Sequence, residues 1–218
     1  MHGLGFPFYL TGGTALGRFY INHRFSEDLD FFVNSDPLYP EYIAEIKGKI
    51  GKSFDINLQQ SLFSDDFTRM FIEEGEVSLK IEFVNDVEHY PGKPASFSYG
   101  LIDTPLNILS NKLTAVTGRD EPKDIFDIVY ISRNYSFNWQ DVFYHSKQKS
   151  VINEIDVEKR ICTFPAGLLK SVNWLKSPFD ETSFTKDLQQ VADDFFLGKD
   201  NSLGVKKPLI ENALPHLS

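Results

Sequence analysis

The sequence is poor in cysteine. Cys162 is the only cysteine among 218 residues, so an internal disulfide is excluded. A chain with one thiol suits a reducing compartment. We expect Cys162 to be a small core residue rather than a nucleophile.

Long apolar runs and positive charge are also scarce. No apolar run reaches the roughly 20 residues that a membrane-spanning helix needs, and the first residues carry no positive cluster typical of a signal peptide. We therefore expect a cytoplasmic protein without membrane contact. The formal net charge is −9, which argues against broad binding of duplex DNA. A hydrophobic content of 41% nevertheless predicts a compact folded protein.

The first half of the chain mixes strand and helix patterns. A Gly12-Gly13 turn separates the first strand from a helix, and short polar turns separate the last three strands, as in an antiparallel meander. Residues 90–98 contain two prolines and a glycine and are expected to form a loop. The expected strands are 6–11, 28–33, 55–63, 68–74 and 77–84, and the expected helices are 14–22 and 39–50.

From about residue 103 the pattern becomes helical. Asp103 is the expected N-cap of the first of these helices, with Pro105 in its first turn. The sequence thus predicts an α+β protein, with a mixed or antiparallel sheet and flanking helices in residues 1–102 and a helical bundle in residues 103–218. The expected helices of the bundle are 104–117, a helix from 122 that carries Ile125, Ile128, Val129 and Ser132 on one face, 139–150, 165–175 and 183–196.

Three carboxylates carry the strongest chemical signal. Asp28 and Asp30 stand two positions apart in an expected strand, so they project from one face. Buried like charges at that spacing are unfavourable, and a divalent cation removes the repulsion. Oxygen ligands favour Mg²⁺ or Mn²⁺ over zinc, and the histidines show no spacing typical of a zinc site. Glu82, from another strand, would complete a two-metal clamp for phosphoryl chemistry.

The Gly12-Gly13 turn predicts a phosphate site. Glycines let the backbone approach a ligand closely, and the helix that follows presents free N–H groups. The hydroxyl of Thr14 is a further donor there. The other candidates for phosphate contacts are Arg24, Ser26 and Lys80.

Each piece also has a plain interpretation. An Asp-x-Asp pair is often a solvated strand face, and a Gly-Gly pair is often only a turn. The ordered combination favours the metal site, because the acids alternate with apolar residues that must be buried. These apolar residues are Leu29, Phe31 and Phe32.

At these residues the chain resembles the AbiEii-type nucleotidyltransferases, toxin-like members of the polymerase-beta-type superfamily. The resemblance spans roughly residues 8–132. The segments that carry it are residues 12–16 (GGTAL), 24–32 (RFSEDLDFF), 80–82 (KIE) and 111–115 (NKLTA), with Arg119, Lys123, Asp124 and Asp127.

The resemblance implies roles for individual residues. It makes Gly12, Gly13 and Thr14 the phosphate-binding turn. It makes Asp28 and Asp30 ligands of both metals, and Glu82 a ligand of the catalytic metal that helps to position or activate the acceptor hydroxyl. Lys112 and Lys123 would contact the nucleotide, and Asp127, one helical turn from Lys123, would orient it; the alternative for Lys123 and Asp127 is a plain surface ion pair.

The resemblance also implies a function. The chain would transfer a nucleoside monophosphate from an NTP to an acceptor hydroxyl on tRNA or protein, as a toxin restrained by a separate antitoxin. Three alternatives stay open: a catalytically silent nucleotide-binding module, a metal-dependent phosphohydrolase, and a small-molecule nucleotidyltransferase of the aminoglycoside-modifying kind. Relatives usually have a helical stretch before the first strand, whereas this strand begins almost at Met1. We therefore expect an N-terminal segment to be missing.

Overall fold

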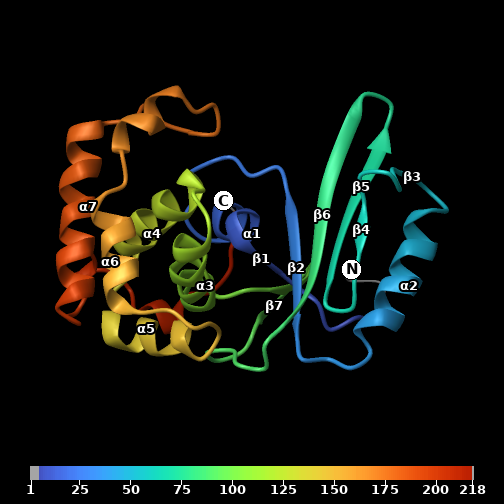
Figure 1. Ribbon diagram of the computed structural model, residues 1–218, viewed down its shortest axis with the longest axis horizontal. Coiled ribbons are helices and arrows are strands. Elements are labelled where there is room, and N and C mark those ends of the chain that lie inside the picture. Colours follow the sequence, from blue (N-terminus) through green and yellow to red (C-terminus); the bar gives the residue numbers. More distant parts are fainter. Residues whose placement is uncertain (1–4, 218) are drawn as a thin grey trace. The chain divides into compact units, whose positions relative to one another are not determined.

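The computed structural model describes residues 5–217, which form two compact units (Figure 1). The first unit contains the residues up to Ala15, Ser26–Glu88 and Pro94–Asp103. The second contains Leu16–Phe25, His89–Lys93 and the residues from Thr104 onward. The expectation of a missing N-terminal segment concerns a part of the chain outside the described residues.

The first unit is built on one mixed eight-stranded sheet. Its path is β3-β5-β6-β2-β1-β8-β7, and β4 pairs with β5 beside β3. The β1–β8 and β2–β6 pairs are parallel, and the others are antiparallel. The strands are β1 (Tyr9–Thr11), β2 (Leu29–Asn34), β3 (Asp55–Ile56), β4 (Leu62–Phe63), β5 (Phe67–Glu74), β6 (Val77–Asp86), β7 (Ala95–Phe97) and β8 (Gly100–Ile102).

Helix α2 (Tyr39–Ile50) packs on one face of this sheet. Its ends agree with the prediction, because Pro40 suits a first helical turn and the apolar residues recur at helical spacing. Ile43 and Ile46 are buried in the core cluster, and Leu29 and Phe31 of β2 pack against it. The opposite face of β2 therefore carries the alternate residues, as the strand pattern predicted.

Two expectations for the first unit were wrong. Residues 55–63 form two short strands rather than one, because Asn57 makes a turn between them: its side-chain oxygen accepts from the Gln60 N–H and its carbonyl from the Ser61 N–H. The expected loop of residues 90–98 contains β7, which pairs with β8 as a hairpin. Strands of three residues leave too little alternation to be read from the sequence.

Helix α1 (Gly12–Phe19) begins two residues before the expected start at Thr14. Its first turn belongs to the first unit and its last turn to the second. The second unit otherwise consists of α3 (Pro105–Gly118), α4 (Pro122–Asn134), α5 (Trp139–Lys147), α6 (Glu154–Cys162), α7 (Glu181–Phe196) and the 3₁₀ helices η1 (Ala166–Ser171), η2 (Ser202–Gly204) and η3 (Ile210–Asn212).

The helical second unit confirms the expected fold class, with three local corrections. Thr104, not Asp103, caps α3, since its hydroxyl accepts from the Asn107 N–H at 3.3 Å. Helix α6 was not predicted, and the expected helix 165–175 is the shorter 3₁₀ helix η1. The predicted apolar face of α4 is buried as expected.

Cys162 is only partly buried. The pKa of its thiol is raised to about 11, mainly by burial and secondly by its hydrogen bond to Glu158.

Among residues 5–217, no helix is both long enough and apolar enough to cross a bilayer.

Candidate active site

The predicted acids lie together on the face of the sheet opposite α2. In the parallel β2–β6 pair, Asp30 and Glu82 are directly opposed, so their side chains leave the sheet on the same side. Asp28 immediately precedes β2, two positions before Asp30. The structure thus brings the three predicted carboxylates to one patch of the first unit.

The glycine turn packs directly against these acids. Gly12 has a φ of +67°, a left-handed conformation that glycine adopts without steric cost. A Cβ on Gly12 would lie 2.6 Å from Oδ2 of Asp30. The hydroxyl of the buried Thr14 donates to the backbone carbonyl of Asp28. The turn therefore lies close to Asp30, and the Thr14 hydrogen bond ties it to Asp28.

Two basic side chains lie among the carboxylates. Lys80 Nζ is 2.9 Å from Oδ2 of Asp28 and 3.6 Å from Oε1 of Glu82. Arg69, which faces Glu82 from β5, places its Nε 2.7 Å from the same Oε1 atom. Burial lowers the pKa of Lys80, but the hydrogen bond to Asp28 and the neighbouring carboxylates outweigh it, so its pKa is raised and the ammonium stays charged.

The donor set fits a hard divalent cation by its chemistry. All three side chains offer carboxylate oxygens, the ligands that Mg²⁺ and Mn²⁺ prefer. Within the part of the chain that the structure describes, however, no three His, Cys, Asp or Glu side chains are gathered closely enough to hold a metal ion. The contacts of Lys80 and Arg69 offer a physical reason, because these two cations already balance part of the negative charge.

The second unit contains a buried ion-pair cluster built on Asp127. Arg24 binds its carboxylate with two hydrogen bonds of 2.6 and 2.7 Å, and His23 Nε2 lies 2.7 Å from Oδ1. Lys112 Nζ lies 2.8 Å from Oδ2 of Asp127 and 2.7 Å from Oδ1 of Asp124. All five residues are buried.

This cluster corrects the expected Lys123–Asp127 pair. Both oxygens of Asp127 are taken by Arg24, His23 and Lys112, and Lys123 is not among its partners in residues 5–217. Arg24, expected to contact phosphate, instead has its side chain 2% exposed and bound to Asp127. A buried charge without a partner is unfavourable, so the buried basic groups pair with this buried acid.

Within the cluster, the charged groups shift one another's pKa values. Burial raises the pKa of Asp127, yet the charges of Lys112 and Arg24 outweigh it and hold the pKa well below its usual range. Burial lowers the pKa of Lys112, and Asp127 and Asp124 raise it above its ordinary value. Burial and the charges of Arg24 and Lys112 lower the pKa of His23 despite Asp127, so its ring is neutral.

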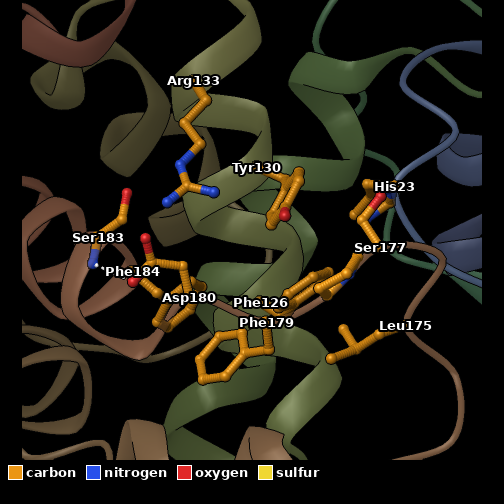
Figure 2. A pocket seen from close by; sticks show the side chains of 11 residues that line it. His23, Phe126, Tyr130, Arg133, Leu175, Ser177, Phe179, Asp180, Ser183 and Phe184 are labelled. Carbon is orange, nitrogen blue, oxygen red and sulfur yellow. Dashed lines mark hydrogen bonds between the residues drawn. The ribbon is translucent and has the colours of Figure 1, made fainter.

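An aromatic hollow of about 80 Å³ adjoins this cluster in the second unit (Figure 2). His23 stacks on Phe126, and Arg133 lies over Tyr130 at 4.9 Å while its Nε bonds Asp187 at 2.7 Å. Tyr130 and Arg133 come from neighbouring turns of α4. Because its walls include stacked rings and Arg133, which is held in the ion pair with Asp187, we assign the hollow a packing role.

The remaining predicted residues are less informative. Gly13 is buried in the first turn of α1, and Ser26 and Lys123 are half-buried. Sequence reasoning missed Arg69 and His23. A basic residue inside a strand was the only signal for Arg69, and its meaning depends on the β5–β6 register.

A comparison with protein families places the chain in one of them. A family model described as "Nucleotidyl transferase AbiEii toxin, Type IV TA system" matches residues 2–214. A search of the curated proteins finds no match.

Two solved structures from Helicobacter pylori share the fold. JHP933 from Helicobacter pylori is 22% identical, with 88% of this chain and 85% of that chain covered and a TM-score of 0.57. A putative nucleotidyltransferase from the same species is 21% identical, with 88% of each chain covered and a TM-score of 0.58. The MenT4 nucleotidyltransferase toxin from Mycobacterium tuberculosis is 15% identical over 87% of this chain and 75% of that chain, with a TM-score of 0.49.

Proposed function

The chain belongs to the AbiEii family of nucleotidyl transferase toxins, and from this premise we propose that it transfers a nucleoside monophosphate from an NTP to an acceptor hydroxyl with Mg²⁺ or Mn²⁺. The oxygen of the acceptor hydroxyl forms a bond to the α-phosphorus, the bond from that phosphorus to the bridging oxygen breaks, and pyrophosphate leaves.

The observation that supports this proposal is the shared face of Asp28, Asp30 and Glu82, with the Gly12 backbone against Asp30. These carboxylates would hold the metal ions. When bound, Mg²⁺ would neutralise the triphosphate and orient the reacting oxygens. Glu82 would also accept the proton of the acceptor hydroxyl. Because the protein does little covalent work in such a transfer, positioning accounts for most of the catalysis.

The N-terminus of α1 is the proposed phosphate site. Its backbone N–H groups at Gly12, Gly13 and Thr14 lie where a helix attracts anions. Since the Thr14 hydroxyl already donates to Asp28, we assign this side chain a positioning role. Ser26 and Lys80 are the proposed side-chain contacts to phosphate.

The helical residues divide into two groups in this proposal. Arg24, Lys112 and Asp127 hold one another in the buried cluster, so we assign them to positioning. Lys123 is half-buried and outside the cluster, so it is the proposed nucleotide contact from α4.

The proposed acceptor is a tRNA end or a protein side chain, and the proposed partner is an antitoxin protein, as the toxin family suggests. A catalytically silent binding module is the second candidate. It is favoured by the contacts of Lys80 and Arg69, which balance the carboxylates without a metal.

NTPs labelled on either the α- or the γ-phosphate separate these functions. The protein would be incubated with Mg²⁺ and with RNA, protein extract or aminoglycosides as acceptors. The proposal predicts that α-label, but not γ-label, enters RNA or protein. Release of γ-label as free phosphate without an acceptor would indicate a phosphohydrolase, transfer to an aminoglycoside would indicate a small-molecule enzyme, and no reaction at all would indicate the silent module.

A further inference from the structure

Lys80 holds a distinctive place among the acids of the first unit. Its ammonium contacts two of the three carboxylates, at 2.9 Å from Asp28 and 3.6 Å from Glu82. Its side chain comes from β6, the strand that carries Glu82. Arg69 differs, because among the described residues its ion pair is with Glu82 alone.

A cation between two carboxylates does electrostatically what a metal ion would do there. It reduces the repulsion between the acids and orders their side chains. The contacted oxygens are Oδ2 of Asp28 and Oε1 of Glu82. A divalent ion bridging the same carboxylates would meet the ammonium at close range, and two like charges at such a distance repel.

The Lys80 side chain is also free to leave. It is 27% exposed, and the Asp28 and Glu82 side chains are 42% and 18% exposed. Ion pairs in contact with solvent are weak, each contributing about 1 kcal/mol or less, and the four-carbon stem of lysine is flexible. A divalent ion with charge +2 can therefore displace the ammonium, whereas a buried pair would resist.

We propose that Lys80 is an internal counter-ion that holds the metal position between Asp28 and Glu82 in the resting protein, and that a divalent cation binds there by displacing it. This inference rests on the proposed function, because it takes these carboxylates as the metal site. In this role Lys80 competes with the metal ion for the carboxylates, and this competition sets the metal concentration at which the site fills.

Binding of Mn²⁺, followed by the electron paramagnetic resonance signal of the free ion, tests this without any enzymatic turnover. Wild type, Lys80→Met and Arg69→Met would be titrated at one pH and ionic strength. Arg69→Met is the matched control, because it removes one positive charge beside the same Glu82 oxygen without removing a bridge between two acids.

Lys80→Met should lower the Mn²⁺ dissociation constant about tenfold, the change expected when two partly exposed ion pairs no longer compete. Arg69→Met should lower it less than about threefold. Equal constants for wild type and Lys80→Met, or equal gains in both variants, would overturn the inference. Lys80→Gln, whose side chain is also neutral, should match Lys80→Met and guards against an effect of misfolding.

The double variant Asp28→Ala/Asp30→Ala shows whether the bound Mn²⁺ is at this site, since it should lose that binding. If wild type binds no Mn²⁺, or the double variant binds it equally well, the metal-dependent function itself is contradicted. If wild type binds Mn²⁺ at these acids but Lys80→Met leaves the constant unchanged, only the inference about Lys80 fails.

Discussion

At the scale of single residues, the backbone conformation of Gly12 bears directly on the candidate site. Its positive φ disfavours any L side chain, and a Cβ there would press on Asp30. Gly12→Ala should cost about 1–2 kcal/mol of unfolding free energy and abolish transfer of α-label, because the Asp30 carboxylate must move. Urea unfolding and the labelling assay measure the two effects.

Gly48→Ala is the control for Gly12→Ala. Gly48 lies within α2, with open space where a Cβ would lie. Alanine there should raise stability by up to about 1 kcal/mol and leave transfer unchanged. A Gly12→Ala protein with normal transfer would show that the glycine turn does not position Asp30.

Asp127 is the buried acid that pairs with His23, Arg24 and Lys112 in the second unit. Asp127→Asn leaves Arg24 and Lys112 buried with too little negative charge, so we expect a loss of about 3–5 kcal/mol of unfolding free energy. Lys49→Met, which removes an exposed pair with Glu45, should cost less than about 0.5 kcal/mol. Similar losses in the two variants, measured by urea unfolding, would contradict a stabilising role for the cluster.

His23 makes stability depend on pH. Burial lowers its pKa in the folded state, so the unfolded chain takes up a proton near pH 6.5 while the folded chain stays neutral. Stability is therefore full above about pH 6.5 and falls as the pH drops toward 5, by at most about 1.4 kcal/mol per pH unit for one group. Thermal melts across this range, which lies above the usual carboxylate range, measure the slope.

His23→Gln keeps an N–H donor for Asp127 but cannot be protonated, so it should make this slope shallower. Burial also lowers the pKa values of His89 and His145, so part of the slope should remain. The exposed His216 supplies the control variant His216→Gln. An unchanged slope in His23→Gln would mean that folding does not lower the pKa of His23.

The sequence predicted the site only in part, for reasons visible at single residues. Strand alternation placed Asp28 and Asp30 on one face, and the β2–β6 register brings Glu82 beside Asp30. The contact of His23 could not be predicted, because its partner Asp127 is distant in the sequence. Arg69 faces Glu82 across the β5–β6 hairpin, so its position depends only on the local register of two predicted strands.

At the scale of elements, the start of α3 offers two neighbouring residues that could act as its N-cap. Asp103 and Thr104 both suit an N-cap, but Asp103 is fully buried and accepts a hydrogen bond from the Thr11 hydroxyl. Thr104 therefore caps the helix, and Thr104→Ala should cost about 1 kcal/mol. Thr117→Ala, inside the same helix, should be near neutral or slightly stabilising. Equal effects in urea unfolding would remove the cap assignment.

Elements with strong periodicity could be predicted and short ones could not. Helix α2 has regular apolar spacing and a proline in its first turn, and its ends agree with the prediction. Helix α6 buries only Val157 and Ile161 amid charged residues, a stripe too narrow to stand out. The β7–β8 hairpin depends on the parallel pairing of β8 with β1, which no local pattern reveals.

At the scale of the whole molecule, the two compact units interleave in sequence. Leu16–Phe25 groups with the helical unit although it lies between two strands of the sheet. Leu16 and Phe19 are buried there, and Arg24 and His23 join the Asp127 cluster. Composition could indicate the change near residue 103, but it could not assign this N-terminal segment, because such an assignment depends on contacts with α4.

The central claim is that the carboxylates beside the glycine turn catalyse nucleotidyl transfer. The most direct test incubates wild type and Asp28→Ala/Asp30→Ala with Mg²⁺, each of the four α-labelled NTPs in turn, and total cellular RNA and protein. We predict label on RNA or protein with wild type and none with the double variant. Absence of transfer by wild type with every NTP, or equal transfer by the double variant, would contradict the claim.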